Sequence, residues 1–231
     1  TGGATVTFAR TGGTSTGSFS GVIDNGDGTY SSVFTGVLAG TATTITGTVG
    51  GSAVTTTLPT VTVSPGTLSL AQSAITVSSS SVASGANVTL TLTARDAAGN
   101  SLTTGGSTVV FNRSGGTSTG TISGTTDVGN GTYTATFTGV VSGTPTSITA
   151  TVGGAAVTSI SPTVTVVPGA ISLANSTISV SAATVASGSG VTLTLTGRDA
   201  ANNALTSGGS SILFGFTGGT STGSISPTSD N

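Results

Sequence analysis

The chain repeats itself with a period of 103 residues, and this period sets the size of the unit that has to fold. The motif TGGTSTG at Thr11–Gly17 returns as SGGTSTG at Ser114–Gly120 and as TGGTSTG at Thr217–Gly223. No insertion or deletion interrupts the overlap between copies. Such a period matches a whole domain, because solenoid repeats are only about 20–45 residues long. We therefore expect each copy to close its own core, like beads on a string.

Pro-Gly pairs at 65–66 and 168–169 mark the natural seams, because proline and glycine end strands and turn the chain. The seams predict a partial repeat at 1–66 without its early strands, a complete repeat at 67–169, and a partial repeat at 170–231 without its late strands. The chain contains no methionine, so we expect a processed chain or a window from a longer array. In a second interpretation, the early strands of one chain complete the partial repeat of the next by strand donation.

Apolar and polar residues alternate along most of the complete repeat. In Val88–Ala94, four apolar residues take one face and three threonines take the other. A period of two with one apolar face is typical of antiparallel sheets. Short strands separated by turn signals predict an all-β fold built as a two-sheet sandwich, and no segment has helical periodicity. The same alternation is present in Ala74–Val77, Thr108–Phe111, Thr132–Thr138, Ser147–Val152 and Thr163–Val167.

The composition excludes most catalytic and metal chemistry. The chain lacks Lys, Glu, His, Cys, Met and Trp, and its only charged groups are four arginines and six aspartates. Zinc or copper sites of ordinary type, Ser-His-Asp or Cys-His arrangements and lysine Schiff bases are therefore impossible. Four arginines cannot neutralise a nucleic-acid backbone, and no apolar run approaches the about 20 residues of a membrane span. We predict that the chain is not an enzyme, with no catalytic, cofactor-binding or metal-ligating residue, no cofactor and no nucleic-acid partner.

One motif contains two carboxylates among glycines and raises the question of a calcium loop. Asp24–Tyr30 reads DNGDGTY, and Asp127–Tyr133 reads DVGNGTY. Asn-Gly and Asp-Gly pairs favour hairpins, whose turns need positive φ. A calcium loop needs acidic ligands at set positions, whereas Asp27 is replaced by Asn130 in the second copy. We favour the turn interpretation and keep calcium as the alternative.

The pairs Arg95-Asp96 and Arg198-Asp199 follow a threonine-rich strand and lead into a turn. We expect each aspartate to fix the turn by accepting backbone N–H groups, with the arginine on the surface. The threonine faces of the strands favour a solvated surface. Ice binding, sheet packing or O-linked sugar are the alternatives.

The order of motifs resembles a known family. The quoted stretches are SLANSTISVSAATVASGSGVTLTLTGRDAANNALTSGGSSILF at 172–214, GGTSTGSISPTSDN at 218–231 and GNGTYTATFTGVVSGTPTSITATVGG at 129–154. Together they resemble the bacterial Ig-like repeats of the invasin and intimin group, most of all the invasin third-domain type. The GDGTY strand start is also similar to filamin-type Ig repeats. The resemblance covers essentially the whole chain and implies tandem Ig-like sandwiches in secreted or surface-anchored proteins, where they serve as stalks and adhesive arms. It carries over no site residue.

We therefore expect a structural Ig-like repeat segment of a bacterial extracellular filament or surface adhesin, located outside the cell or on its surface. The segment would give length and associate with itself, because a charged fraction of only 4% removes most of the repulsion between copies. Two alternatives stay open. The first is a module that binds host or surface glycans or a receptor, and the second is a set of accessory repeats of a large secreted enzyme.

Overall fold

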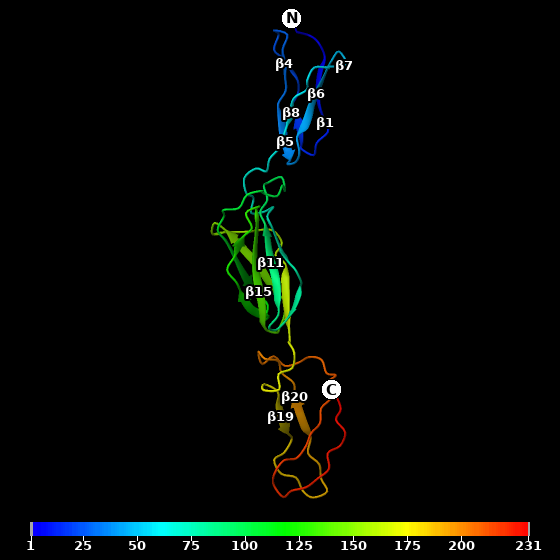
Figure 1. Ribbon diagram of the computed structural model, residues 1–231, viewed down its shortest axis with the longest axis vertical. Coiled ribbons are helices and arrows are strands. Elements are labelled where there is room, and N and C mark those ends of the chain that lie inside the picture. The colour runs from blue at the N-terminus through cyan, green and yellow to red at the C-terminus, as the bar shows by residue number, and fades with distance from the viewer. Residues whose placement is uncertain (1, 231) are drawn as a thin grey trace.

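The structure is a computed structural model that describes residues 2–230, all of them in strands, turns or loops. Three parts follow one another along the long axis, with the start of the chain at one end and its last part at the other (Figure 1). Within residues 2–230 there is no helix of the length and hydropathy that a membrane crossing requires.

The central repeat, residues 67–169, contains two sheets. All strand pairs in them are antiparallel, except that β10 runs parallel to β18. The first sheet has the order β13 (Thr119–Ile122), β15 (Thr132–Val141), β11 (Asn87–Thr93) and β9 (Ala74–Val77), with β14 (Thr126–Asp127) beside β15. The second has the order β10 (Ser81–Ala83), β18 (Thr163–Val167), β16 (Thr146–Val152) and β12 (Val109–Ser114), with β17 (Ala155–Ala156) beside β16.

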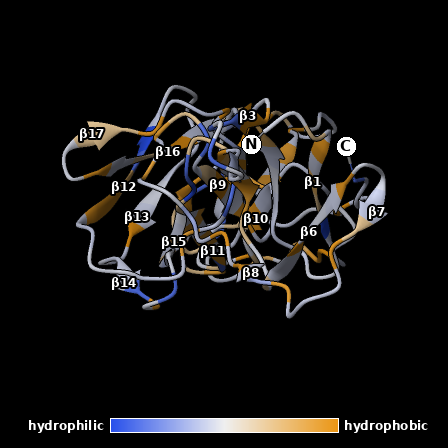
Figure 2. Ribbon diagram, turned by 90° about the horizontal axis from the view of Figure 1, so that it is seen from above, coloured by the Kyte–Doolittle hydropathy of each residue, from blue (hydrophilic) through white to orange (hydrophobic). Residues whose placement is uncertain are grey.

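The core lies between these sheets and consists of the alternate apolar residues. Leu90, Leu92 and Phe137 of the first sheet and Ile148 and Val164 of the second are all 0% exposed. Burial of such a side chain contributes about 1.5–3 kcal/mol each. Hydrophobic residues recur along the strands, and strongly hydrophilic residues occupy only a few short stretches of the ribbon (Figure 2). The predicted all-β sandwich is confirmed.

The flanking parts contain the counterparts of these strands at an offset of 103 residues. The first segment has the equivalents of β12 to β18, and the last has the equivalents of β9 and β11. The first segment contains β1 (Val6–Thr11), β2 (Thr16–Phe19), β3 (Ile23–Asp24), β4 (Tyr30–Ser31), β5 (Phe34–Leu38), β6 (Thr43–Val49), β7 (Ser52–Ala53) and β8 (Thr60–Val61). The last contains β19 (Thr177–Val180) and β20 (Leu193–Thr196).

The recurring GGTSTG motif forms the turn between β12 and β13, and its serine explains why it recurs. The hydroxyl of Ser118, which is 0% exposed, accepts a hydrogen bond from Val166 N–H at 2.9 Å and donates to Gly143 O at 3.0 Å. Gly116 has a φ of +62°, and a Cβ there would lie 2.0 Å from Pro145 O. The motif therefore fixes the turn against the last strand, and the first segment repeats the bond with Ser15 and Val63.

We predict that Ser118→Ala destabilises the protein by about 1–3 kcal/mol, because the buried N–H of Val166 loses its acceptor and no water replaces it. The matched control is Ser123→Ala. Its hydroxyl also accepts from a strand N–H, that of Thr136 at 2.9 Å, but at an exposed position where water can substitute. Urea unfolding of both variants measures the difference, and equal losses would contradict the role given to Ser118.

Candidate functional site at the junction between repeats

The DVGNGTY motif forms the β14–β15 hairpin and also fastens a distant loop. Asp127 accepts from Gly129 N–H at 2.8 Å with one carboxylate oxygen and from Gly106 N–H at 2.6 Å with the other. Gly129 has a φ of +83°, as the turn interpretation predicts. The Tyr133 hydroxyl accepts from Ser107 N–H at 3.1 Å. The motif therefore holds the loop that leads into β12. The first segment repeats both contacts, since Asp24 accepts from Gly3 N–H and the Tyr30 hydroxyl accepts from Ala4 N–H.

These contacts favour the turn over the calcium loop, because backbone donors already engage both oxygens of Asp127. Within residues 2–230, no three acidic side chains gather as a metal-binding group.

Asp96 fixes its turn as expected and also holds the linker between repeats. It is 5% exposed. One carboxylate oxygen accepts from the N–H groups of Ala98 and Asn100, both at 2.9 Å. The other accepts from Gly66 N–H at 2.8 Å, and Gly66 belongs to the Pro-Gly seam. One side chain therefore joins the turn after β11 to the segment through which the chain enters the central repeat.

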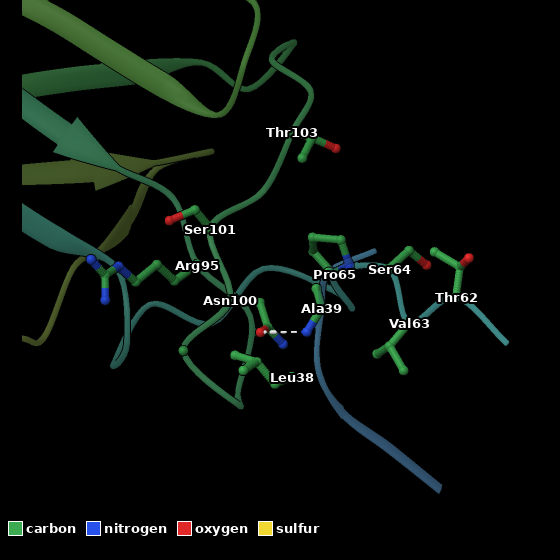
Figure 3. Close-up of a pocket in the computed structure, with 12 residues that line it drawn as sticks. Leu38, Ala39, Thr62, Val63, Ser64, Pro65, Arg95, Asn100, Ser101 and Thr103 are labelled. Atoms are coloured by element: carbon green, nitrogen blue, oxygen red, sulfur yellow. Dashed lines mark hydrogen bonds between the residues drawn. The ribbon is translucent and has the colours of Figure 1, made fainter. Parts of the chain in front are cut away.

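Asn100 extends this arrangement into the preceding repeat. Its side-chain N–H₂ donates to Asp96 at 2.9 Å and to Val37 O at 2.8 Å, and its oxygen accepts from Ala39 N–H at 2.9 Å (Figure 3). Val37 lies in β5, and Ala39 is the first residue after the end of that strand. Both amide hydrogens and the amide oxygen are thus in use. We call Asp96, Asn100 and their partners Gly66, Val37 and Ala39 the junction clamp.

The same clamp recurs at the next junction, with every residue shifted by 103. Asp199, 1% exposed, accepts from Gly169 N–H at 2.8 Å and from the side chain of Asn203 at 2.8 Å. Asn203 donates to Val140 O at 2.8 Å and accepts from Ser142 N–H at 2.8 Å. Repetition to this detail indicates that the clamp is a property of the repeat and not of one local contact.

The hydrogen bonds of the clamp keep both carboxylates ionised. The N–H of Gly66, followed by the amide of Asn100, lowers the pKa of Asp96 from 3.8 to about 2. At Asp199, burial acts most strongly and raises the pKa. The bonds from Gly169 and Asn203 together outweigh it and leave the pKa at about 2. Because the folded pKa lies below the unfolded one, this stabilisation is present above about pH 3.8 and is lost as the pH falls through about 2.

An open groove of about 700 Å³ lies beside the first clamp. Leu38, Val63 and Pro65 line it from one side, and Asn100 and Arg95 line it from the other. Arg95 is half-buried rather than on the surface, so the expectation of a surface arginine is wrong here, and its Nε has no hydrogen-bond partner. Its guanidinium points away from the first repeat (Figure 3). With one charged side chain in its lining, the groove offers packing and no acid–base pair.

The sequence motifs identified the aspartates of the clamp but not the asparagines. A signal was present, since both copies keep asparagine four residues after aspartate while the intervening turn changes from Gly99 to Asn202. Both turns have positive φ at that position, +84° at Gly99 and +69° at Asn202. The turn therefore tolerates substitution, whereas the asparagine side chain that reaches the preceding repeat is retained.

The sequence profile of the family described as "Invasin, domain 3" matches residues 69–169. Residues 69–169 form a bacterial Ig-like domain of the invasin type. The match begins just after the clamped Gly66 and ends at the clamped Gly169. Among curated proteins, none matches the sequence.

Two solved structures are similar to this chain over most of its length. FdeC, described as an adhesin of Escherichia coli, is 28% identical with a TM-score of 0.53 over 89% of this chain and 66% of its own. Invasin, described as a bacterial integrin-binding protein, is 20% identical with a TM-score of 0.50 over 89% of this chain and 41% of its own. The likeness to invasin shows the fold alone. The chain thus spans just under two thirds of the FdeC structure and less than half of the invasin structure.

We predict that each clamp holds only its own junction. Pulsed electron paramagnetic resonance with spin labels at Ser31→Cys and Thr121→Cys reports the first junction, and labels at Thr121→Cys and Ser179→Cys report the second. All three positions are exposed, and the chain has no native cysteine. Asn100→Ala should broaden the first distance distribution and leave the second narrow, and Asn203→Ala should do the reverse. Narrow distributions in both variants would show that other contacts hold the junctions.

Proposed function

We propose that this chain is a stiff spacer segment of a bacterial surface adhesin, exposed outside the cell, where it sets the distance between the cell and an adhesive part. The observation that supports this role is the clamp, which recurs at both junctions. The likeness to FdeC, which is described as an adhesin, supports the surface location. The invasin-type domain offers no reactive pair of side chains at its junction groove, so the function proposed is structural and not catalytic.

The clamp is strong enough to matter for stiffness. A typical intramolecular hydrogen bond contributes about 0.5–1.5 kcal/mol net, so the two bonds from Asn100 to the preceding repeat contribute about 1–3 kcal/mol. This favours the docked junction over the free one by roughly five- to 160-fold. The linker bond from Gly66 to Asp96 adds to that preference. Repeats joined in this way form a rod, whereas unclamped beads would pivot at each Pro-Gly seam.

Association between neighbouring chains is the second part of the proposal. The outer face of the β13–β15–β11–β9 sheet consists mainly of hydroxyl side chains, with Thr91 opposite both Thr134 and Thr76, and Thr138 opposite Thr121. Such uncharged faces do not repel one another, unlike surfaces that carry a high charge of one sign. They support lateral contact between parallel rods.

A glycan- or receptor-binding role for this segment has less support. Binding interfaces are enriched in tyrosine and tryptophan, and the chain has two tyrosines and no tryptophan. Tyr133 is 2% exposed, and the hydroxyls of Tyr133 and Tyr30 both accept from backbone N–H groups.

A domain swap in the source bacterium distinguishes a spacer role from a binding role. Replacement of residues 67–169 by an unrelated rigid domain of equal length should preserve adhesion, whereas their deletion should reduce it. Antibodies against the chain should label intact cells in both strains. Loss of adhesion in the swapped strain would show that these residues themselves bind the target.

Self-association has a separate measurement. Sedimentation velocity of the purified chain should show a concentration-dependent increase in the average sedimentation coefficient. The increase should diminish when Thr91→Lys and Thr136→Lys place two positive charges on the hydroxyl face. The control, Thr149→Lys with Thr151→Lys, changes the outer face of the other sheet in β16. A single unchanging species at all concentrations would contradict this part of the proposal.

A further inference from the structure

Tension applied to the rod runs along the strands of the central repeat. The chain enters this repeat at the end that faces the first segment and leaves it at the end that faces the last segment (Figure 1). Strands β11 and β15 lie along the long axis between those ends (Figure 1). Any pull between neighbouring repeats is therefore parallel to the strands and loads their hydrogen bonds in shear.

One pair of strands joins the entering part of the repeat, after β9, to its last strand. Strand β10 belongs to the entering part of the repeat and β18 is its last strand, and they pair in parallel over three residues from Ser81 opposite Thr165 to Ala83 opposite Val167. Two further bonds frame this pair, from Thr165 N–H to Ser80 O at 2.9 Å and from Ser84 N–H to Val167 O at 2.8 Å. Strand β9 precedes β10 and pairs with β11, so it is loaded first. Once β9 has separated, tension draws β10 toward the first segment and β18 toward the last, so these two strands must slide past each other.

We propose that the β10–β18 pair is a mechanical lock that resists unfolding of the repeat under tension. In shear, all bonds of the pair carry the load together, and none can break until the whole pair slides. The pair is also packed, because Val82 and Val166 are 6% and 1% exposed. This property goes beyond a spacer role, since a spacer only has to hold a distance, whereas the lock keeps the repeat folded while the distance is under strain.

The lock is connected to the junction clamp through one carbonyl group. Val140 O accepts from the Ser84 hydroxyl at 2.8 Å and from the side chain of Asn203 at 2.8 Å. A carbonyl oxygen has two lone pairs, so both bonds form at once. Ser84 directly follows β10, and Asn203 belongs to the next repeat. A pull on the next repeat therefore reaches β10 through Val140 as well as β18 through the chain.

The last strand is held on its other side as well. Val166 N–H donates to the buried hydroxyl of Ser118, which belongs to the turn between β12 and β13. β18 therefore cannot move outward to release β10 without also breaking a buried bond.

Single-molecule force spectroscopy in two pulling directions tests the lock without a change to its core. The chain has no cysteine, so two introduced thiols define the points of attachment in the full chain. Ser64→Cys with Ala170→Cys pulls along the axis, and Ser80→Cys with Thr163→Cys pulls the same ends of β10 and β18 apart. All four positions are exposed, and equal urea midpoints for the two variants confirm equal folding.

When the pull is axial, the three residue pairs of β10 and β18 share the load. When the same ends of the two strands are pulled apart, the pairs open one after another. We therefore expect a roughly threefold higher unfolding force along the axis. With Ser179→Cys in place of Ala170→Cys, the axial pull passes through the last repeat and loads the route from Asn203 through Val140 to Ser84. In that arrangement the Ser84→Ala variant should lower the axial force, and it should leave the force of the second direction unchanged. Equal forces in the two directions overturn the proposal. An unchanged axial force in Ser84→Ala overturns the connection through Val140.

Discussion

The carboxylate of Asp96 is the one group on which the geometry of the junction depends. It accepts hydrogen bonds from the linker, from the following turn and from Asn100, and the orientation of Asn100 decides whether the amide reaches the preceding repeat. A protein with lysine and glutamate could join domains by ion pairs at its surface. This chain has neither, and a buried carboxylate that accepts backbone N–H groups takes their place. Bonds of this charge-assisted kind contribute about 1.5–3 kcal/mol each, more than an exposed ion pair usually does.

The junction also constrains the length of the segments that contain its residues. The central repeat has two different ends, one with Asp96 and Asn100 and one with the strand end that receives Asn203. A head-to-tail contact of this kind does not close on itself, so it extends for as many copies as the chain contains. An insertion in the turn that contains Asn100, or after the strand that ends at Val37–Ala39, would move one partner out of reach. A repeated clamp therefore requires these two segments to keep their lengths from one copy to the next.

Much of the sandwich could be predicted from the sequence, because its long strands alternate cleanly. Strands β11, β15, β16 and β18 lie within about one to three residues of the expected ranges, since burial of one face determines both pattern and register. Strands β10 and β13 were not predicted. They contain three and four residues, and Ser81–Ala83 has too few apolar positions to show a period. Their assignment depends on pairing with β18 and β15, which lie far away in the sequence or beyond a loop.

Only those contacts of the candidate site that join residues close in sequence could be predicted. Asp96 and its turn lie within four residues of each other, so turn chemistry identified them. Asn100 and Val37 are 63 residues apart, and no local pattern indicates that an asparagine in one turn faces a carbonyl of another repeat. For Arg95, the strand pattern indicated only that it follows the apolar face, and it did not predict that the side chain is half-buried.

A stiff junction changes what a weakly associating surface can do. The hydroxyl face of one sheet is small, about 20 Å across its four side-by-side strands at a spacing of roughly 4.8 Å, and one such face falls short of a stable interface. If the repeats pivoted freely, each face would have to find its partner independently. A clamp at every junction fixes the rotation from one repeat to the next, so the faces recur in constant orientation along the rod. If neighbouring rods associate as proposed, the first contact between them aligns the following ones, and the combined affinity rises with the number of repeats without any new contact within a repeat.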